Sequence, residues 1–349
     1  MVHNSRIAKT QTIRRVVPDL IAPDGRTDER LGRVVRLLSE HALVVVSGTK
    51  IADEIGVTRS ALWRLIEQLR SLGVEIAGHP ATGYQLESFP DLLLPDILAP
   101  LLRGCRFSDV HHYFKISSTN AVAMQAAADG VPEGTVFVAE EQTAGRGRGG
   151  HDWLSERSTG IYCSLVLRPT VAPADVLMLS LLTGLAVVEA VEHTLGVRPD
   201  VRWPNDLLLG GRKFCGILTE MNAEATRVRY AVVGIGINVN QPEFPGELAE
   251  TATSLRRETG RSWSRVELTA ALLKSLDREY ARLGGDSRET IARFEAACST
   301  ARGERVRVDE NGGFEGVTEG LDERGFLRVR TADGIRTVLS GGVRPVSGS

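Results

Sequence analysis

The chain has 349 residues, of which 42 are Lys or Arg and 44 are Asp or Glu, so its formal net charge is −2. A content of 42% hydrophobic and 25% charged residues is typical of a globular protein and excludes a largely disordered chain. At about 100–200 residues per domain, the length predicts two or three domains. The near-neutral charge excludes a polyelectrolyte nucleic-acid binder. Any DNA binding must therefore reside in one small domain.

The spacing of the cysteines and the length of the apolar runs narrow the class of protein further. Cys105, Cys163, Cys215 and Cys298 form no CxxC pair, which argues against a structural metal site or a disulfide framework and favours the reducing cytoplasm. The apolar runs fall short of the roughly 20 residues needed to cross a membrane, so no membrane partner is expected. Residues 1–30 are irregular, and we expect a disordered tail or a start codon placed too early.

Residues 31–90 carry the pattern of short helices followed by a hairpin. Apolar residues at helical spacing begin at Leu31, and Thr49 and Thr58 can each cap a later helix, with Gly56 between them. A helix, a tight turn that contains glycine and a second helix, in this order, are typical of a helix-turn-helix motif. Alternating apolar residues over 74–86 then predict a β-wing.

The second of these helices is the candidate for contact with DNA, because its N-terminal residues reach base edges in the major groove. The residues at that position are Thr58, Arg59, Ser60 and Arg64. Trp63 is compatible with either face of the helix. Acidic and basic groups are nearly balanced over this region, so a module that only packs on the rest of the protein is the alternative interpretation.

A glycine-rich loop follows the apolar strand that ends at Ala139. It has the sequence EEQTAGRGRGGHDW over residues 140–153. Unhindered backbone N–H groups and the guanidinium groups of Arg146 and Arg148 suit a phosphate or a carboxylate. The loop is neither a Walker loop nor a dinucleotide fingerprint. An ordered anion site is favoured over a flexible surface loop or an RNA-binding RGG segment.

Two further motifs lie between residues 202 and 240. RWPNDLLLGGRKFCGILTE predicts a hairpin through Gly210-Gly211. Within it, Lys213 is either a solvated strand-end residue, which spacing alone favours, or a cation aimed into a pocket. Asn205 and Asp206 either form the turn or hold a ligand or metal ion. In GIGINVN, glycines inside an apolar strand indicate a close approach by a ligand or by a packed helix.

In this order, Ser118-Thr119-Asn120, Gln142 with GRGRGGHDW, RWPNDLLLGGRKFCGILTE and GIGINVN resemble the motifs of the bifunctional biotin–protein ligase and biotin operon repressor family (group II). The resemblance covers residues 31–346. It implies a multidomain α+β fold, with a winged helix-turn-helix at 31–90 and a mixed-sheet α/β ligase domain, like that of class II aminoacyl-tRNA synthetases, at 91–298. An SH3-like barrel would occupy 299–349, where short alternating runs predict β structure by themselves.

The activity implied by the resemblance is ATP- and Mg²⁺-dependent biotinylation through biotinyl-5′-AMP, which passes biotin to a lysine of the biotin carboxyl carrier protein of acetyl-CoA carboxylase. The implied catalytic residues are Lys213, Arg148 and Arg146. The implied biotin contacts are Ser118, Thr119, Asn120, Gln142, Gly145, Arg146, Arg148, Lys213, Gly216, Gly234 and Gly236. The implied ATP and adenylate contacts are Arg148, Trp153, Asn205, Asp206, Lys213 and Asn238. Asp206 is the candidate Mg²⁺ contact.

Two loop positions depart from the family pattern. Gly149 and His151 stand where relatives often carry basic residues, which implies looser adenylate retention. Arg202 replaces a common Lys and keeps the charge but not its geometry.

Regulation is implied by the same resemblance. Adenylate binding would promote homodimerisation, and the dimer would bind the biotin operator. Two alternatives stay open: a ligase whose first domain binds no DNA, and a ligand-sensing transcription factor without ligase activity. Retention of Lys213 and of the loop arginines argues against the second. A lipoate ligase would lack the GRGRGG–W pattern. Because the first domain is itself nearly neutral, DNA binding should depend on dimerisation.

Overall fold

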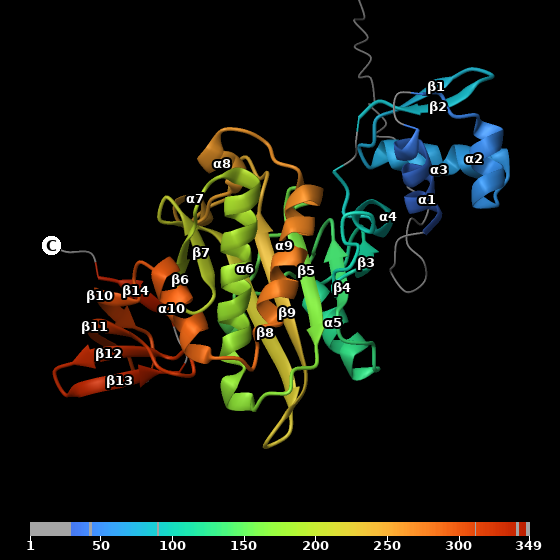
Figure 1. The fold of residues 1–349 in the computed structure, drawn as a ribbon. Helices are drawn as coiled ribbons and strands as arrows, with labels where there is room; N and C mark the ends of the chain where they lie inside the picture. The colour runs from blue at the N-terminus through green and yellow to red at the C-terminus, as the bar shows by residue number, and fades with distance from the viewer. Residues whose placement is uncertain (1–28, 42–43, 89–90, 311, 340–341, 347–349) are drawn as a thin grey trace, which may run out of the picture.

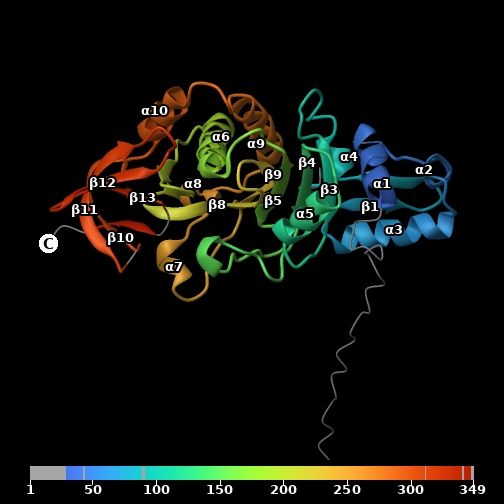
Figure 2. The same cartoon turned by 90° about the horizontal axis from the view of Figure 1, so that it is seen from below.

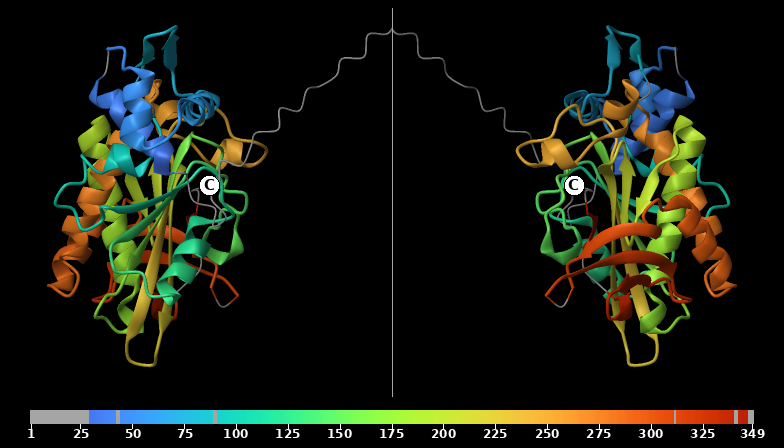
Figure 3. Two further views of the ribbon diagram at one scale, coloured as in Figure 1. Left: turned by 90° about the vertical axis from the view of Figure 1, so that its right-hand side faces the viewer. Right: turned by 90° about the vertical axis from the view of Figure 1, so that its left-hand side faces the viewer.

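The chain folds into three units that follow one another along the molecule (Figures 1 and 2). The computed structural model describes residues 29–41, 44–88, 91–310, 312–339 and 342–346. The expected disordered tail lies outside these residues, except for Glu29 and Arg30, which begin the first helix. Figure 3 shows the first unit at one end of the central sheet and the β8–β9 hairpin at the opposite end.

The first unit is the expected winged helix-turn-helix. Its elements are α1 (Glu29–Glu40), α2 (Gly48–Ile55), α3 (Arg59–Ser71), β1 (Ile76–His79) and β2 (Gly83–Leu86). Gly56 ends α2 in the left-handed region, with φ at 72°, where glycine has no steric penalty. Thr58 caps α3 by accepting a hydrogen bond from the Ala61 amide at 3.2 Å. The wing is held to α3 because Arg70 donates two hydrogen bonds to the Ile76 carbonyl.

The second unit is a seven-stranded mixed sheet in the order β3-β4-β5-β9-β8-β7-β6. Its strands are β3 (Asp109–Tyr113), β4 (Thr135–Ala139), β5 (Gly160–Leu167), β6 (Asp200–Arg202), β7 (Asp206–Leu209), β8 (Arg212–Ala223) and β9 (Val228–Asn238). β3 and β4 are parallel, and the other neighbours are antiparallel. Its helices are α4 (Pro95–Leu98), α5 (Thr119–Ala128), α6 (Leu177–Leu195), α7 (Leu248–Thr251), α8 (Leu255–Thr259), α9 (Arg265–Tyr280) and α10 (Ser287–Ala297).

The two faces of this sheet are covered differently. On one face, α6 and α9 pack over alternate β9 residues Val233, Ile235 and Ile237. On the other face, α5 packs over Val232 and its neighbours. The face beside α5 is therefore only partly covered, and the rest of it is available for a ligand pocket.

The expected hairpin over 201–220 is only partly confirmed. β7 and β8 pair through the Gly210-Gly211 turn as predicted. The first apolar run, however, is divided at 203–205, where Trp203 and Pro204 are joined by a cis peptide bond. β6 and β7 consequently form a hairpin of their own. The turn that the sequence allows here is confirmed at Asn205, whereas Asp206 already begins β7.

The helix over Pro173–Leu195 corrects the expectation about membrane-spanning length. With 23 residues and high mean hydropathy, it is long and apolar enough to cross a membrane by composition alone. In the fold, most of this helix is buried inside the protein, as in the core helix of a globular domain. Counting uninterrupted apolar runs missed it because Ser180, Thr183 and Gly184 interrupt the run without lowering its average much.

The third unit is a five-stranded antiparallel sheet in the order β13-β12-β11-β10-β14. Its strands are β10 (Arg302–Val308), β11 (Phe314–Leu321), β12 (Leu327–Thr331), β13 (Gly334–Val338) and β14 (Val343–Pro345). The β structure that the short alternating runs predict over 299–349 is confirmed. Val306 and Leu327 belong to the same hydrophobic core as the central sheet, and the buried Trp203 Nε1 donates to the Gly325 carbonyl at 2.9 Å.

A short linker joins the first unit to the second. Leu92 and Leu94 pack into the helix-turn-helix core, whereas Leu93 between them packs into the core of the central sheet. Asp91 accepts hydrogen bonds from the Arg265 backbone and guanidinium at 2.7 and 3.1 Å. Consecutive residues thus belong to different cores, which ties the two units together.

A buried ion pair lies where the linker meets the sheet. Glu140 follows β4 and accepts hydrogen bonds from the Leu93 amide at 2.9 Å and from His112 at 3.1 Å. Its other oxygen pairs with Arg265 at 2.8 Å and accepts from Ser158 at 3.0 Å. Burial raises the pKa of Glu140, but Arg265 and His112 outweigh it and lower that pKa to about 2.

Candidate functional site

A pocket opens on the partly covered face of the central sheet. It is lined by Ser118, Thr119, Asn120, Gln142, Arg146, Gly147, Arg148, Trp153, Tyr162, Cys163, Asn205, Lys213, Gly216, Ile217, Leu218, Gly234, Ile235 and Gly236. The space inside it, counted out to open solvent, is about 430 Å³. The three sequence motifs, far apart along the chain, therefore meet in one cavity.

The floor of the pocket is bare backbone. Gly216 of β8 pairs with Gly236 of β9. A Cβ atom on Gly236 would lie 2.4 Å from Cε2 of Trp153, and one on Gly234 would lie 2.1 Å from Oδ1 of Asn120. Glycine is thus required because side chains from other elements lie directly on the strands, which confirms the expected close approach.

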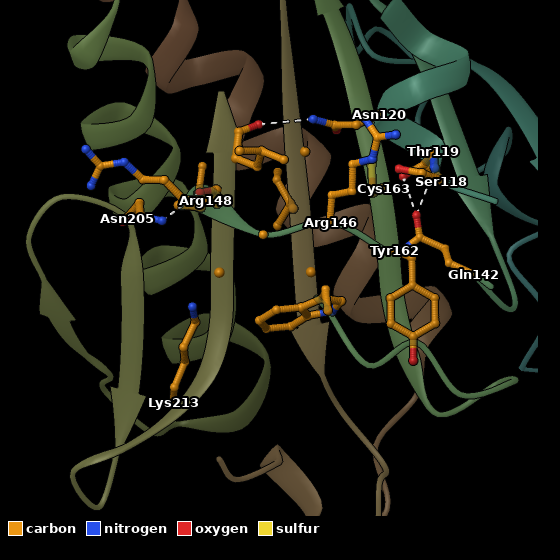
Figure 4. Close-up of a pocket in the computed structure, with 18 residues that line it drawn as sticks. Ser118, Thr119, Asn120, Gln142, Arg146, Arg148, Tyr162, Cys163, Asn205 and Lys213 are labelled. Carbon is orange, nitrogen blue, oxygen red and sulfur yellow. Dashed lines mark hydrogen bonds between the residues drawn. The ribbon is translucent and has the colours of Figure 1, made fainter. Parts of the chain in front are cut away.

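The glycine-rich loop is an ordered hairpin. The Trp153 amide donates to the Gly145 carbonyl at 2.9 Å, and the Gly147 amide donates to the His151 carbonyl at 2.6 Å. Gly149 and Gly150 turn the tip with φ values of 71° and 82°. Figure 4 shows Arg146 extending toward Asn120 and Arg148 extending toward the Asn205 side of the pocket. Burial lowers the pKa of Arg148, while Asp206 and Glu310 act in the opposite direction.

Three charged side chains meet at the side formed by β7 and β8. Asp206 pairs with Lys213 Nζ at 2.6 Å and with Arg202 Nη2 at 2.7 Å. Lys213 Nζ also lies 5.3 Å from the centre of the Trp153 ring. Lys213 lines the cavity, so its side chain is not that of a merely solvated strand end (Figure 4). Two cations, Lys213 and Arg202, therefore share one carboxylate, and Lys213 lines the cavity that an anionic ligand would enter.

Polar side chains converge at the opposite end of the pocket (Figure 4). Gln142 Oε1 accepts hydrogen bonds from the Thr119 amide at 2.8 Å and from the Thr119 hydroxyl at 3.1 Å. Its amide nitrogen donates to Ser155 at 2.8 Å, which links this end to the loop hairpin. Ser118, Thr119 and Asn120 are brought there by the N-terminus of α5. The pocket thus has an end of uncharged polar side chains, toward which Arg146 extends, and an end at which Lys213 and Arg148 lie.

Comparison with known proteins identifies this arrangement. Family models match residues 30–85 (HTH domain), 113–238 (biotin/lipoate A/B protein ligase family) and 303–343 (biotin protein ligase C terminal domain). The bifunctional ligase/repressor BirA of Bacillus spizizenii is 37% identical over 311 residues, which are 88% of this chain and 96% of that protein. The chain belongs to the bifunctional biotin ligase/repressor family. The resemblance drawn from its motifs is confirmed.

Two further relatives of this ligase/repressor cover the catalytic part. A biotin--[acetyl-CoA-carboxylase] ligase of Mycobacterium tuberculosis is 35% identical over 217 residues, 60% of this chain and 79% of that protein. The biotin protein ligase of Aquifex aeolicus in complex with biotin and ATP has a TM-score of 0.61 and 32% identity, covering 69% of this chain and all of that one. The similarity therefore extends from sequence to fold.

Three of the expected ligand contacts do not line the pocket of this family member. Asn238 is buried, donates to the Thr253 carbonyl at 3.1 Å and accepts from Gln241 at 3.3 Å. Gly145 lies behind the pocket against the Trp153 carbonyl. Asp206 does not line the cavity but pairs with the lining residue Lys213.

Some lining residues were not expected from the sequence. They are Gly147, Tyr162, Cys163, Ile217, Leu218 and Ile235. Tyr162 faces Gly236 across the β5–β9 register, so strand alternation combined with the glycine strand would have found it. Among the described residues, the buried Trp153 Nε1 has no hydrogen-bond partner, although buried indole N–H groups usually have one.

The expected DNA-contacting residues all lie on the exposed face of α3 and at its cap. Thr58, Arg59, Ser60 and Arg64 are exposed, and Trp63 joins them with 56% of its surface exposed. The buried face of α3 does not need Trp63, because Leu62 and Ile66 fill the hydrophobic core on that side. The structure thus resolves the orientation of Trp63, which the sequence left open.

Proposed function

We propose that this chain is an ATP-dependent biotin–protein ligase that also represses biotin-synthesis genes in response to biotin. The observation that carries the ligase half is the shared pocket, in which Lys213 and Arg148 lie on one side of a glycine floor and the polar cluster lies on the other side, with Arg146 extending toward Asn120. Such a site can hold a neutral cyclic head group at one end and two anionic groups at the other. Biotin and ATP are the ligands bound by the Aquifex aeolicus relative.

In the first half-reaction, a carboxylate oxygen of biotin attacks the α-phosphorus of ATP. The bond from the α-phosphorus to the bridging oxygen breaks, and pyrophosphate leaves with the electron pair. Two anions must approach and charge builds on the phosphate, so fixed cations and backbone donors lower the barrier. Lys213 would bridge the carboxylate and the α-phosphate as a point charge. Positioning dominates, and no enzyme nucleophile is required.

The cation partner of ATP is Mg²⁺, and the candidate protein contact for it is Asp206. Among the described residues, no group of three or more His, Cys, Asp or Glu side chains is placed to hold a metal ion. Proteins commonly bind Mg²⁺ through one or two carboxylates together with substrate phosphates, and Asp206 supplies such a carboxylate beside Lys213. Bound there, the ion would neutralise phosphate charge.

In the second half-reaction, the ε-amine of a carrier lysine attacks the acyl carbon of biotinyl-5′-AMP. The amine loses a proton, an amide forms and AMP leaves. We propose the biotin carboxyl carrier protein of acetyl-CoA carboxylase as acceptor, in keeping with the name of the Mycobacterium tuberculosis relative. Until the acceptor arrives, the acyl-adenylate must be kept from water.

Within this proposal the pocket ends have different ligands. The biotin head group is assigned to Ser118, Thr119, Asn120 and Gln142, with Gly145, Gly216, Gly234 and Gly236 allowing close approach. The adenylate is assigned to Arg146, Arg148, Trp153, Asn205, Asp206, Lys213 and Asn238, with Asn238 acting from behind.

The first prediction concerns retention of the adenylate. An Arg148→Ala variant should release biotinyl-5′-AMP about 10–100 times faster, because one charge-assisted hydrogen bond between the loop and the adenylate is lost. The release rate can be followed after preloading, with a radiolabelled adenylate chased by unlabelled adenylate. Arg157→Ala, a change at an exposed arginine beyond the loop, is the matched control. Equal release rates for wild type and Arg148→Ala would remove Arg148 from the retention role.

The repressor half is assigned to the winged helix-turn-helix. Adenylate binding would promote homodimerisation, and two copies of α3 would read two half-sites of an operator. The near balance of charge in this unit supports dimer-dependent binding, since phosphate attraction by one copy is weak.

A second prediction tests this surface. An Arg64→Ala variant should bind operator DNA more weakly by about 1–3 kcal/mol, because a base-edge contact is lost, while biotinylation is unchanged. Gel shifts with biotin and ATP present measure the first quantity, and carrier labelling measures the second. Undiminished operator binding would place the DNA interface elsewhere.

One experiment separates the proposed activities. The full chain is given biotin, ATP, Mg²⁺ and the carrier domain, and a gel shift on the biotin operator is run with and without adenylate. Transfer with an adenylate-dependent shift supports both roles. Transfer without any shift leaves a ligase whose first domain binds no DNA. A shift without transfer leaves a ligand-sensing transcription factor.

The finer assignment of the fold is also a proposal. We retain the boundaries 31–90, 91–298 and 299–349, the SH3-like barrel for the last unit and the relation of the central unit to class II synthetases. Four buried and unpaired cysteines support a cytoplasmic location.

A further inference from the structure

Asn120 lies across the floor of the pocket and is fixed from both sides. Its Oδ1 accepts a hydrogen bond from Ser164 of β5 at 2.6 Å. Its Nδ2 donates to Glu220 of β8 at 2.9 Å and, at 3.4 Å, to the Leu218 carbonyl. Ser164, Gly234 and Leu218 stand at one level of three neighbouring strands. The missing side chain of Gly234 leaves room for the amide.

The chemistry of these partners determines which way the amide points. An ionised carboxylate only accepts hydrogen bonds, so Glu220 requires the nitrogen of Asn120 on its side. The Oδ1 atom is then placed over Gly234, where a Cβ would come within 2.1 Å of it, beside the cavity that both residues line. A carbonyl oxygen has two lone pairs, and Ser164 uses one of them.

We propose that Glu220, which lies outside the residues lining the pocket, is a positioning residue that sets the polarity of the head-group end. By holding the Asn120 nitrogen, Glu220 presents the Asn120 oxygen to the ligand as an acceptor. The ligand must therefore offer an N–H donor at this point, and the ureido ring of biotin has two. This inference rests on the proposed binding of biotin and adds the residue that selects for its N–H groups.

Without Glu220, a flip of the amide would be opposed only by the 3.4 Å contact to the Leu218 carbonyl and by Ser164, whose hydroxyl also reaches Thr119 at 2.8 Å. A flipped amide would present N–H groups to the ureido N–H, which is unfavourable, and would leave Ser164 to re-orient its hydroxyl. A glutamine at 220 still offers an amide oxygen as acceptor. The conservative variant should therefore restore what alanine loses, which a purely charge-based role would not allow.

The test compares Glu220→Ala and Glu220→Gln with wild type in the full chain. Biotin and its mono-N-methyl ureido derivatives serve as substrates, and pyrophosphate release gives KM and kcat. The expected result for Glu220→Ala is a KM for biotin raised about tenfold, the effect of one lost hydrogen bond, with kcat within about twofold. Its preference for biotin over the N-methyl derivative that wild type rejects should fall by a similar factor. Glu220→Gln should lie near wild type in both measures.

The matched control is Glu224→Ala, at an exposed glutamate of the same hairpin that pairs with Arg227 at 2.9 Å. It should leave KM, kcat and substrate preference unchanged. Equal loss in the Ala and Gln variants, or a Glu220→Ala variant that loses thermal stability while keeping KM and preference, would overturn the proposal. Failure of wild type to release pyrophosphate with biotin would instead overturn the proposed ligase function, so the two failures are distinct.

Discussion

A Lys213→Met variant is expected to form biotinyl-5′-AMP about 10²–10³-fold more slowly than wild type, the cost of losing one preorganised group that stabilises charge in a transition state. Lys213 Nζ is held at 2.6 Å from Asp206 and lies 5.3 Å from the Trp153 ring centre. An unbranched methionine fills similar space without the charge. Rapid-quench measurement of adenylate from biotin and ATP gives the rate.

Two comparisons make this result specific to the first half-reaction. Transfer from premade biotinyl-5′-AMP to the carrier should be affected much less, because the bond between the α-phosphate and pyrophosphate has already been broken. Arg212→Met is the matched control, since Arg212 is the next cation on the same strand and pairs with Glu258 at 2.6 Å instead. Adenylation at the wild-type rate in Lys213→Met, or equal loss in both variants, would contradict the role assigned to Lys213.

A Glu140→Gln variant is expected to lower the free energy of unfolding by about 3–5 kcal/mol, the usual cost of removing one partner of a buried ion pair. Both charged side chains are buried, and Arg265 would be left facing a neutral amide at 2.8 Å. Chemical denaturation measures the difference. Glu289→Gln, which removes an exposed partner of Arg282 at 2.9 Å, should change stability by less than about 1 kcal/mol.

The pH dependence of stability gives an independent signature of Glu140. Its pKa is about 2 in the folded chain against an ordinary value of 4.5. The stabilisation is therefore fully present above pH 4.5 and is lost progressively as the pH falls from 4.5 toward 2, because the unfolded state takes up the proton first. In Glu140→Gln the difference in stability from wild type should shrink over this interval. A difference that stays constant would contradict the account.

Glu140 also connects the linker to the pocket. Its oxygens bind the Leu93 amide and Arg265, and the chain continues two residues later into Gln142, which contacts Thr119. Because Leu92 and Leu94 pack with the DNA-binding unit, this junction joins the two proposed activities through a few rigid contacts.

Much of the fold follows from local patterns in the sequence. Caps such as Thr58, terminal glycines such as Gly56 and the alternation of apolar residues place the helices and most strands. These features are local, because each depends on residues only a few positions apart in the sequence. The length of β9 is not local, because pairing with distant strands decides it.

The candidate site follows from its motifs and not from any single residue. Lys213 on its own is best interpreted as a solvated strand end, and only the ordered set of motifs indicates a pocket. Two residues are placed by strand register: Tyr162, which lies outside the motifs, and Glu220, the last residue of RWPNDLLLGGRKFCGILTE. Their neighbours across the sheet are Gly236 and Val232, and a sequence without the strand pairing does not reveal these neighbours.

The most direct test of the ligase assignment is a single-turnover mixture of the chain with biotin, Mg²⁺ and ATP labelled in the α-phosphate, quenched in acid and without carrier. The account predicts one labelled biotinyl-5′-AMP per active chain, formed together with one pyrophosphate and discharged as AMP when carrier is added before the quench. Absence of labelled adenylate under saturating biotin and ATP would contradict it.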